Sequence, residues 1–369
     1  MKILQISTYY LPNFGGIEQV AFDFSRILKQ QGNCVKVICF NSSKETITDI
    51  YDGIEVTRVG YKKKFASQAI SLSYFFILKK LIKDFAPDVI HIHLPNPLIA
   101  TYLLLLNPSC RITLHWHSDI IKQKRLKQLY YPFEKKILRR ADKIIATSKI
   151  YAEKSESISI YLEKVSIIPN IVDTKFLDDL SENDKKQISA IREKFANKKI
   201  VFFIGVHREY KGLQYLVDAA KYLTTDYVVL IAGKGPLTDE LKKKVLELSL
   251  KNVFFIGRIS EEEKKHYLWA SDVYAFPSIT KNEAFGIALA EALYCELPAV
   301  TFTIDGSGVN WVNKDGVTGL EVKECSAEKY ANALMSVSKE LYSKNAREWV
   351  EKNFTEKAIN DRVKDFFAN

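Results

Sequence analysis

Two glutamates stand eight residues apart in the segment 277–296, PSITKNEAFGIALAEALYCE. Glu283 precedes the expected helix 288–293, and Glu291 lies inside it. A helix N-terminus offers unpaired N–H groups to a phosphate, and Gly286 lets a ligand approach the backbone closely. Carboxylates accept hydrogen bonds from sugar hydroxyls. The segment therefore suits an anionic, hydroxyl-rich ligand such as a nucleotide sugar, although any strand–loop–helix unit can hold a glycine and two acids.

A basic pair follows the expected strand 200–204 in the sequence GVHREYKG. Arg208 and Lys211 can hold the two negative charges of a diphosphate. Solvated basic side chains in a loop are the other interpretation. A loop with paired glycines, PNFGGIE, follows the expected strand Lys2–Ile6, and Gly16 would bring a helix N-terminus to a diphosphate. Gly-Gly is also common in ordinary turns, and no G-x-G-x-x-G fingerprint occurs in the sequence.

The sequence HWHSD follows the expected strand 111–114, so its polar side chains stand where sites form in parallel sheets. His115 and His117 could ligate a metal, but a third and a fourth ligand are not evident in the sequence. A contact between His117 and a substrate is the interpretation that we prefer. The motif HIH, with His91 and His93, is expected to pack at the end of a buried strand.

Two further strand ends carry loops that suit a nucleotide. The sequence GKGP at 233–236 reads as a turn into a helix and would line a nucleotide pocket. In FIGRIS, the backbone near Arg258 and Ile259 could bind the edge of a nucleobase.

The elements that would position these residues alternate between strands and helices, which implies parallel sheets with helices on both faces. The pattern begins again after the charged stretch 178–197, so we expect two doubly wound, Rossmann-like α/β domains. Their bounds are 1–180 and 181–350. A last helix near 346–367, with the segment 351–369 at its end, could pack back on the first domain. Ligands of such sheets bind outside the carboxyl ends of the strands, so the expected site is the cleft between the domains.

Composition fits two globular domains. The chain has 369 residues, of which 47% are hydrophobic. Its apolar runs are shorter than the roughly 18 residues that a membrane-spanning helix needs. The start MKILQIST reads as a strand rather than a signal peptide. The five cysteines lack metal-like spacing, which predicts buried free thiols in a reducing cytoplasm.

The net charge of +10 is unevenly distributed. Residues 1–180 hold 26 Lys and Arg against 17 Asp and Glu, whereas residues 181–369 hold 28 against 27. Basic residues are densest between Arg111 and Arg140. A positive face of this kind is compatible with nucleic acid, an anionic membrane surface or an anionic acceptor as partner.

Taken in order, the motifs resemble glycosyltransferase family 4, a family of retaining, nucleotide-sugar-dependent enzymes with the GT-B fold. They are GGIE, HWHSD, PNIVD, GVHREYKG, AGKGP, FIGRIS and PSITKNEAFGIALAEAL. The resemblance covers nearly the whole chain, and the two-glutamate segment is its most specific part. The stretch HSDIIKQKRL is similar to the branch that transfers mannose or related hexoses in bacterial surface polysaccharide assembly.

The resemblance implies a role for each matching residue. Lys211 would bind the donor diphosphate, Glu291 the ribose hydroxyls and Glu283 the donor hexose. The family usually has arginine where this chain has Val206, so Arg208 is the expected substitute. Four positions would act through their backbone, namely Gly16, Phe285, Gly286 and Ile287. His117 matches the histidine near the hexose and the reacting carbon.

The implied reaction moves a hexose, with mannose favoured, from a GDP- or UDP-sugar to a hydroxyl with retained configuration. We expect no protein nucleophile, and the leaving phosphate would assist deprotonation of the acceptor. No D-x-D tripeptide occurs, so we expect chemistry without a metal or another cofactor. A paired-carboxylate glycosidase scheme would leave the basic pair without a purpose. A nucleotide-sugar epimerase of the GT-B fold and a non-catalytic anion-binding module are the alternatives.

The implied acceptor is a glycan or a polyprenyl-diphosphate-linked glycan. That acceptor predicts a cytoplasmic enzyme, peripheral at the inner membrane face. Lys122, Lys124, Arg125 and Lys127 precede the basic amphipathic helix that is expected at 128–139. With the interleaved aromatic residues they would lie on anionic lipid. An ordinary solvated helix face is the other interpretation. Nucleic acid is not an expected partner.

Overall fold

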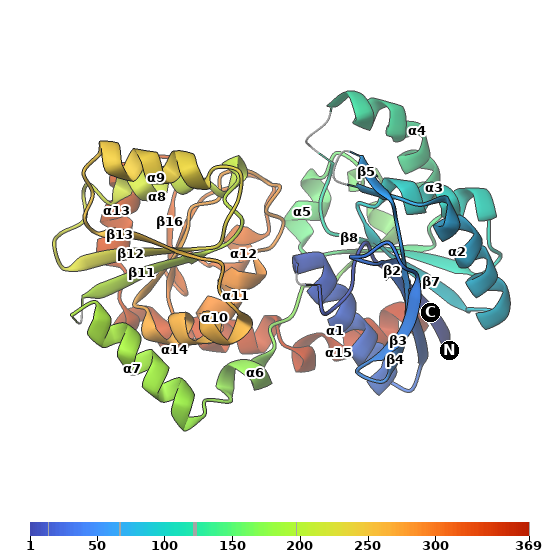
Figure 1. Cartoon of the computed structure of the whole chain (residues 1–369), viewed down its shortest axis with the longest axis horizontal. Coiled ribbons are helices and arrows are strands. Elements are labelled where there is room, and N and C mark those ends of the chain that lie inside the picture. Colours follow the sequence, from blue (N-terminus) through green and yellow to red (C-terminus); the bar gives the residue numbers. More distant parts are fainter. Residues whose placement is uncertain (14, 66–67, 121–123, 197, 369) are drawn as a thin grey trace. The chain divides into compact units, whose positions relative to one another are not determined.

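The computed structural model describes the chain apart from residues 14, 66–67, 121–123, 197 and 369, and apart from the side chains of 63–65, 68 and 124–127. Two compact units share the chain (Figure 1). The first comprises Met1–Asn170 and Ile359–Asn369, and the second comprises Ile171–Ala358. Each unit is built on a largely parallel sheet with helices on its faces, as the alternation of strands and helices predicts.

The first unit contains an eight-stranded sheet in the order β10-β9-β8-β7-β1-β2-β4-β3. Its neighbouring strands are parallel, except that β3 pairs antiparallel with β4. The strand order reverses between β1 and β7, so this is the topological switch point. The strands are β1 (Lys2–Ile6), β2 (Cys34–Phe40), β3 (Ile47–Tyr51), β4 (Ile54–Val59), β7 (Val89–Leu94), β8 (Arg111–Trp116), β9 (Lys143–Ala146) and β10 (Val165–Ile167), with a separate pair β5 (Lys63–Phe65) and β6 (Gln68–Ile70).

The helices of the first unit cover both faces of this sheet (Figure 1). They are α1 (Gly16–Gln30), α2 (Leu72–Phe85), α3 (Pro97–Leu106), α4 (Lys124–Arg140), α5 (Lys149–Lys154), the 3-10 helix η1 (Ser159–Lys164) and most of α15 (Glu356–Ala368). In α1 the buried residues Val20, Phe24, Ile27 and Leu28 recur at helical spacing, and this stripe holds the helix on the sheet.

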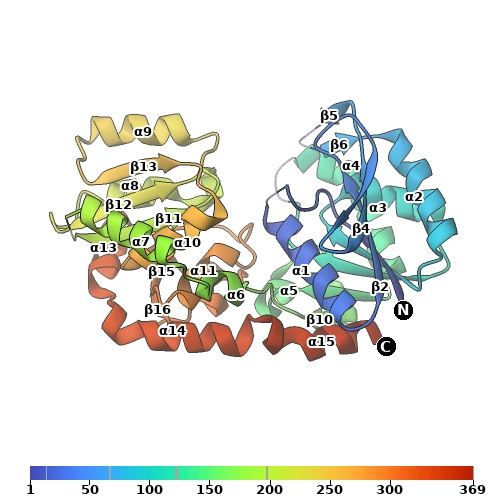
Figure 2. The ribbon, with the colours of Figure 1, turned by 60° about the horizontal axis from the view of Figure 1, so that its bottom comes forward.

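The C-terminal helix α15 is far from the rest of the first unit in sequence, yet it packs against that unit (Figure 2). Phe366 and Phe367 are buried. Lys143 donates to the carbonyl of Phe366 over 3.0 Å, and Arg111 donates to the carbonyl of Phe367 over 2.9 Å. The sequence suggests one helix near 346–367, but the structure has two, α14 (Lys339–Asn353) and α15. The hydroxyl of Thr355 accepts from the Ala358 amide over 3.2 Å, which starts the second helix.

The second unit has a six-stranded parallel sheet in the order β13-β12-β11-β14-β15-β16, with its switch point between β11 and β14. The strands are β11 (Lys199–Ile204), β12 (Tyr227–Ala232), β13 (Val253–Gly257), β14 (Val273–Phe276), β15 (Ala299–Phe302) and β16 (Gly319–Val322). The helices are α6 (Thr174–Asp178), α7 (Glu182–Lys194), η2 (Glu209–Lys211), α8 (Leu213–Ala219), α9 (Thr238–Glu247), α10 (Glu261–Ala270), α11 (Ile287–Tyr294), α12 (Val309–Val312), α13 (Ala327–Ser336) and α14.

Strand β11 shows how this sheet is buried on both faces. Ile200 and Phe202 belong to one apolar cluster, and Val201 and Phe203 belong to another. Alternate side chains point to opposite faces of a strand, so a continuous apolar run is what a doubly covered parallel strand requires. The same feature made these strands recognisable from the sequence.

The antiparallel edge strand β3 escaped the sequence analysis. It joins β4 through Asp52 and Gly53, whose φ angles of 51° and 67° are those of a tight hairpin turn. Asp-Gly between strands is the signal that predicts this turn.

The expectation of buried thiols was partly wrong. All five cysteines are free, and Cys39 and Cys295 are buried, but Cys34 and Cys325 are exposed. In the described part of the chain, every helix is too short or too polar to cross a bilayer.

Candidate active site

Lys211 and Glu283 form an ion pair at the switch point of the second sheet. Lys211 ends the loop that follows β11, and Glu283 lies in the loop that follows the neighbouring strand β14. The pair lies beneath the surface, with the lysine ammonium 5.1 Å from the ring centre of Phe276. Burial acts to lower the pKa of Lys211, but the Glu283 carboxylate outweighs burial and raises that pKa. The lysine therefore stays charged at the point where open α/β sheets bind ligands.

Two glycines bring these loops close enough for the pair to form. Gly212 has a φ of 62°, and a Cβ there would lie 2.0 Å from the carbonyl oxygen of Pro277. Gly286 has a φ of 87° at the start of α11, and a Cβ there would lie 2.9 Å from the ring of Phe276. Other residues at either position would be strained and would collide.

The loop after β11 also carries Arg208 and Val206, and both are exposed. No ion pair is found for Arg208 within the described residues. The backbone amide of Lys211 donates to the carbonyl of Arg208 over 3.0 Å, so the two cations belong to one short turn. His207, directly before Arg208, is buried and hydrogen-bonds Thr238 over 2.9 Å, which anchors this turn to the neighbouring loop.

The loops after β12 and β13 lie at the same edge of the sheet as the loop after β11, because β12 pairs parallel with β11 and β13 pairs parallel with β12. A Cβ at Gly233 would lie 1.9 Å from the carbonyl oxygen of Gly205, so glycine is required there for loop packing. Arg258 is exposed and Ile259 is half-buried in the loop after β13. Ile259 packs against the apolar cluster of the second unit.

Glu291 lies inside α11, and its partner is Lys264 of α10, a residue that the sequence analysis did not assign. Lys264 donates to Glu291 over 2.8 Å and also pairs with Glu261. Burial raises the pKa of Glu291, and the charge of Lys264 offsets part of that effect. Burial acts to lower the pKa of Lys264, but the two glutamates raise it more. The carboxylate is thus held beside a permanent cation.

The start of α11 places Phe285, Gly286 and Ile287 in a row. Phe285 is buried against Phe354 and Trp311, so only its backbone is available to a ligand. In the preceding loop, the Oγ1 of Thr280 and the Oδ1 of Asn282 are buried and have no hydrogen-bond partner within the described residues. Such atoms are costly unless a ligand satisfies them.

In the first unit, Gly16 begins α1 directly after the loop that follows β1. Gly15 and Gly16 are exposed, and a Cβ at Gly15 would lie 2.2 Å from the carboxylate of Glu18. Burial raises the pKa of Glu18, whose side chain folds over this helix start. The glycines leave room for the Glu18 side chain at this helix start, and they expose the backbone of the turn.

His117 follows β8 and belongs to a cluster of four buried histidines, in which His93, His115 and His117 are stacked and His91 lies edge-on to His93 and His115. Its ring lies parallel to that of His115 with centroids 4.3 Å apart, and its Nε2 lies 2.9 Å from Nδ1 of His93. His91 and His93 occupy the neighbouring strand β7, as expected for buried strand residues. The contact between the two histidine pairs was not predicted from the sequence. The sequence signal for this contact is an H-x-H motif in each of two consecutive strands. β7 and β8 pair with each other, and His93 lies opposite His115 in that pairing.

The histidine stack is not shaped like a metal centre. One nitrogen each of His91, His93 and His115 lies within 4.8 Å of the others. However, both ring nitrogens of His93 already make hydrogen bonds, and its ring lies within 22° of the plane of His115. Lone pairs lie in the ring plane, so stacked rings cannot direct them at one ion.

A second group of possible ligands, Asp184, Glu262 and His266, is a structural cluster. Asp184 accepts from His266 over 2.5 Å, from Lys265 over 3.3 Å and from Ser181 at the start of α7. The Lys265 ammonium thus supplies the positive charge beside Asp184, in the place that a metal ion would take.

Asp119, the last residue of HWHSD, also has a structural role. Its carboxylate accepts from Trp116 over 3.0 Å, from Ser155 over 2.6 Å and from the Glu156 amide over 3.0 Å. Its own amide donates to the hydroxyl of Tyr151 over 2.6 Å. These bonds hold the end of β8, so Asp119 stabilises the loop that carries His117.

Comparison with known proteins matches two family models, "Glycosyltransferase Family 4" over residues 14–176 and "Glycosyl transferases group 1" over residues 184–356. The O-antigen chain mannosyltransferase C of Escherichia coli is 31% identical over 100% of this chain and 97% of its own length. The chain belongs to glycosyltransferase family 4. The D-rhamnosyltransferase WbpZ of Pseudomonas aeruginosa is 33% identical over 90% of this chain and 86% of its own length.

The glycosyltransferase also matches solved structures over its whole length. Anabaena Alr3699/HepE in complex with UDP and glucose has a TM-score of 0.78 at 20% identity, covering 100% of both chains. This likeness and the two sheets identify the GT-B fold. The predicted family and fold class are therefore confirmed, and the enzyme class is confirmed as a glycosyltransferase.

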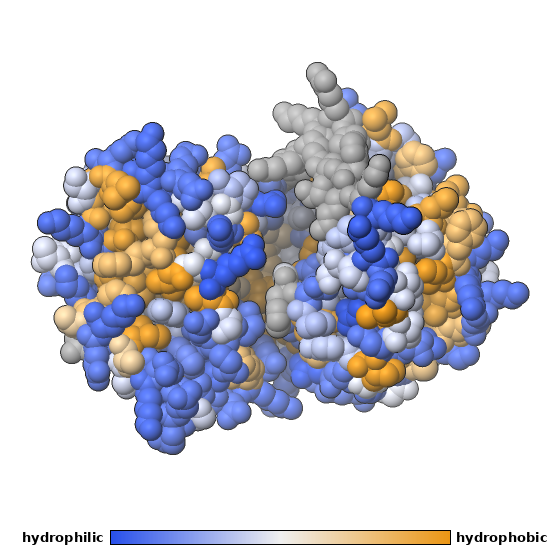
Figure 3. All heavy atoms as spheres, viewed as in Figure 1, coloured by the Kyte–Doolittle hydropathy of each residue, from blue (hydrophilic) through white to orange (hydrophobic). Residues whose placement is uncertain are grey.

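Helix α4 of the glycosyltransferase carries the predicted basic surface. Lys122 lies outside the described residues, as do the side chains of Lys124, Arg125 and Lys127. Further along α4, Leu129 is 73% exposed and Phe133 is 40% exposed. Hydrophobic side chains also gather over α2 and α3 (Figure 3), where Leu72, Phe76 and Leu105 are exposed.

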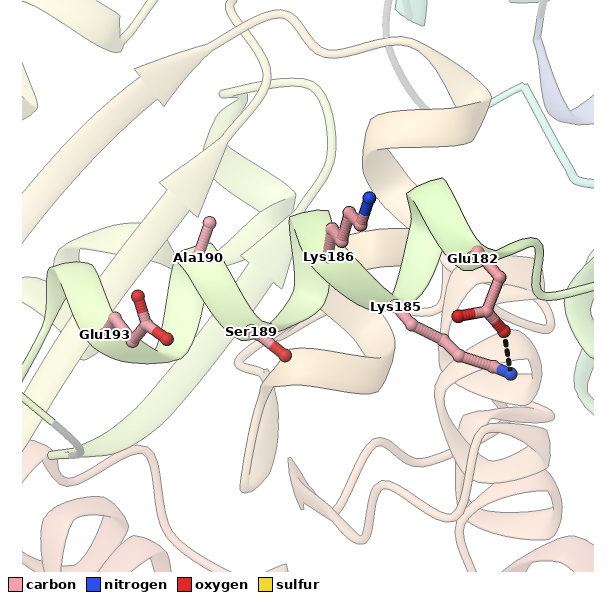
Figure 4. Close-up of a pocket in the computed structure, with 6 residues that line it drawn as sticks. All are labelled: Glu182, Lys185, Lys186, Ser189, Ala190 and Glu193. Carbon is pink, nitrogen blue, oxygen red and sulfur yellow. Dashed lines mark hydrogen bonds and ion pairs between the residues drawn. The ribbon is translucent and has the colours of Figure 1, made fainter.

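A shallow pocket of the glycosyltransferase lies on the outer face of α7 (Figure 4), and none of its lining residues belongs to the site loops. Its lining consists of Glu182, Lys185, Lys186, Ser189, Ala190 and Glu193, all from one helix. Lys185 and Glu182 pair over 2.7 Å. A single solvated helix face of this kind offers no converging groups for a substrate.

Proposed function

We propose that this glycosyltransferase moves a hexose, with mannose favoured, from a nucleotide sugar to a hydroxyl of a glycan or lipid-linked glycan. The reaction would retain the anomeric configuration and would belong to cell-surface polysaccharide synthesis. The ion pair of Lys211 and Glu283 at the switch point carries this proposal. The mannosyltransferase and rhamnosyltransferase relatives support the sugar and the pathway, and the UDP and glucose complex of HepE supports the donor class.

In this proposal the donor replaces an existing contact. Its diphosphate takes the place of Glu283 beside the Lys211 ammonium, and the freed carboxylate of Glu283 accepts from hexose hydroxyls. Arg208 and the N–H groups at the start of α11 share the negative charge that develops on the leaving diphosphate. Preorganised donors of this kind each contribute about 2.7–4 kcal/mol to transition-state stabilisation.

Glu291 would bind the ribose hydroxyls, because the hydrogen bond from Lys264 over 2.8 Å orients its carboxylate. The backbone near Arg258 and Ile259 would bind the base. Gly16 would bring its backbone to the diphosphate, and His117 would contact a sugar hydroxyl. The leaving phosphate, rather than a protein nucleophile, would take the acceptor proton. No metal ion or other cofactor enters the proposed reaction.

The acceptor proposal includes a membrane surface. The side chains of Leu129, Tyr131 and Phe133 are exposed among the basic residues of α4, which is the composition of a helix that lies on anionic lipid. Each basic residue near such a surface contributes roughly 1 kcal/mol. We propose that the enzyme acts at the inner membrane face through this helix.

The test begins with a thermal-shift screen of the full chain against GDP-mannose, UDP-hexoses and UDP-N-acetylhexosamines. A donor that binds is then offered with and without a polyprenyl-diphosphate-linked glycan, and the anomeric configuration of the product is read by NMR. Glu291→Ala should lose donor binding, whereas Lys251→Ala, an exposed lysine of the same unit, should not. Absence of binding to every nucleotide sugar would refute the proposal. Sugar isomerised without acceptor would indicate an epimerase instead.

A further inference from the structure

A chain of buried hydrogen bonds runs from helix α1 to His117. Ser25 donates to the carbonyl of Ala21 over 2.7 Å. The amide nitrogen of Gln5 on β1 donates to the hydroxyl of Ser25 over 2.9 Å. The amide oxygen of Gln5 lies 2.8 Å from Nε2 of His93, and Nδ1 of His93 lies 2.9 Å from Nε2 of His117.

The donor-to-acceptor direction of these hydrogen bonds is set by the carbonyl of Ala21, which can only accept. The carbonyl of Ala21 receives the hydroxyl proton of Ser25, so the Ser25 oxygen accepts from Gln5. The Gln5 nitrogen also lies 3.4 Å from the Ala21 carbonyl oxygen. The opposite amide orientation would place two oxygens there and would lose the bond from Ser25 to Ala21. Gln5 therefore presents its oxygen, an acceptor, to His93.

Because the histidines are neutral, the acceptor role of Gln5 fixes the donor and acceptor nitrogens of His93 and then of His117. Burial holds the pKa of His93 well below its ordinary value and lowers the pKa of His117 to about 3. A neutral imidazole has one donor and one acceptor nitrogen. His93 must donate from Nε2 to Gln5, which leaves its Nδ1 as an acceptor. His117 must then donate from Nε2, and its own Nδ1 carries a lone pair.

The ring of His117 is also fixed in orientation. It lies within 15° of the plane of His93, as an in-plane hydrogen bond requires, and it stacks on His115. Its backbone amide donates to the carbonyl of Leu94 over 3.0 Å. His117 is 8% exposed, and within the described residues its Nδ1 has no hydrogen-bond partner. The free lone pair is thus available to a hydroxyl group of a ligand.

We propose that Gln5 and His93 are positioning residues that hold His117 as the Nε2–H tautomer, so that its Nδ1 accepts a hydrogen bond from a substrate hydroxyl. The identity of that hydroxyl as part of a sugar rests on the proposed function. The tautomer rests only on the contacts of the first unit. Metal-ligating histidines are commonly oriented by such partners, and here the same device would orient a hydrogen-bond acceptor.

The experiment reads the tautomer directly, in the full chain labelled with ¹⁵N. Long-range ¹H–¹⁵N correlation spectra show which ring nitrogen carries the proton, and loss of one signal set in His117→Asn assigns His117. We expect the Nε2–H form in the wild-type chain. His93→Leu removes the acceptor and should give mixed tautomers of His117. His93→Asn can place its amide oxygen near the former Nδ1, so it should restore the Nε2–H form.

The matched control is His91→Asn. His91 lies two residues earlier in β7, is equally buried and hydrogen-bonds Thr113 rather than His117. This variant should leave the tautomer of His117 unchanged. In transfer assays, His93→Leu should lower kcat/KM by about three- to tenfold, the effect of one neutral hydrogen bond, with recovery in His93→Asn.

The outcomes separate this inference from the proposed function. An Nδ1–H form of His117 in the wild-type chain overturns the inference whatever the activity, and so does an unchanged tautomer in folded His93→Leu. If His93→Leu does not fold, the wild-type and His93→Asn spectra decide. The expected spectra in a protein that transfers no sugar would support the positioning chain and refute only the reaction.

Discussion

Lys264 and Glu291 face each other from neighbouring helices, with Nζ 2.8 Å from Oε1 and side chains only 9% and 15% exposed. A carboxylate buried to this extent needs a cation beside it. The pair explains how α11 can carry an acid that is oriented before any ligand binds. It also makes the ribose-binding proposal testable through a residue that would not itself touch the nucleotide.

Replacement of Lys264 by methionine should destabilise the protein through Glu291. Removing one member of a buried pair costs about 3–5 kcal/mol, because the other charge is left uncompensated. Urea unfolding should show this loss for Lys264→Met and a substantial recovery for Lys264→Met/Glu291→Gln. The control is Lys185→Met on the exposed face of α7, where loss of the pair with Glu182 should cost about 1 kcal/mol or less. Equal stability of the single and double variants would contradict the account.

Replacement of Lys211 by alanine should abolish most of the transfer activity while the fold remains. If Lys211 stabilises the leaving diphosphate, kcat should fall by about 10²–10³-fold. Steady-state kinetics against Lys251→Ala measure this effect, and circular dichroism checks the fold. Unchanged kcat in folded Lys211→Ala would remove the lysine from the mechanism.

Acid should destabilise the first unit through its histidine stack. Burial lowers the pKa of His91 and His117 to about 3 and that of His93 and His115 well below the ordinary value. The unfolded chain therefore binds protons below about pH 6.5 that the folded chain does not bind, so stability is present above this pH and falls as pH decreases.

One variant isolates this effect. His115 has no hydrogen bond to lose within the described residues, since both of its ring nitrogens are unpartnered. His115→Phe should make the loss of unfolding free energy between pH 5.5 and 4.5 smaller by about 1.4 kcal/mol per pH unit. Urea titrations at the two pH values measure the difference. An identical pH dependence would mean that His115 is protonated in the folded protein.

Binding to anionic liposomes should be salt-sensitive and should depend on α4. Lys135→Glu/Lys136→Glu should weaken binding to phosphatidylglycerol vesicles, measured by sedimentation, by at least about thirtyfold, given roughly 1 kcal/mol for each lysine charge that is lost and a further repulsion from each glutamate. Lys185→Glu/Lys186→Glu on α7 changes the net charge equally and should have little effect. Equal losses of binding in both variants would show that the net charge of the protein, rather than α4, determines binding. No binding at low salt would refute the membrane proposal.

Chelation should leave transfer activity largely intact. The sequence holds no D-x-D tripeptide, and the proposed leaving-group contacts are Arg208, Lys211 and the start of α11. Assays in EDTA, with and without added Mg²⁺, test this prediction. Strong dependence on Mg²⁺ would require a metal in the reaction and would revise the role of both cations.

The sequence predicted much of the fold. Strand β1 was predicted with its observed bounds, Lys2–Ile6, because buried parallel strands are short apolar runs closed by turns. The break at Thr355 and the edge strand β3 were missed. The first depends on a side-chain cap, and the second is a short edge strand, ITDIY, whose residues are exposed or half-buried and lack the continuous apolar run of a buried strand.

By itself, the sequence determined the family, the two sheets and the loops that carry the candidate residues, since these depend on local periodicity and on motifs at strand ends. Only the tertiary structure decided which partners those residues have. Lys264 meets Glu291 across 27 positions, and Gln5 meets His93 across 88. Local sequence patterns cannot predict such pairs, because a contact between distant positions exists only once the sheets and helices have packed. The charge of Glu291 and the proton of His117 therefore depend on the fold rather than on their neighbours in sequence.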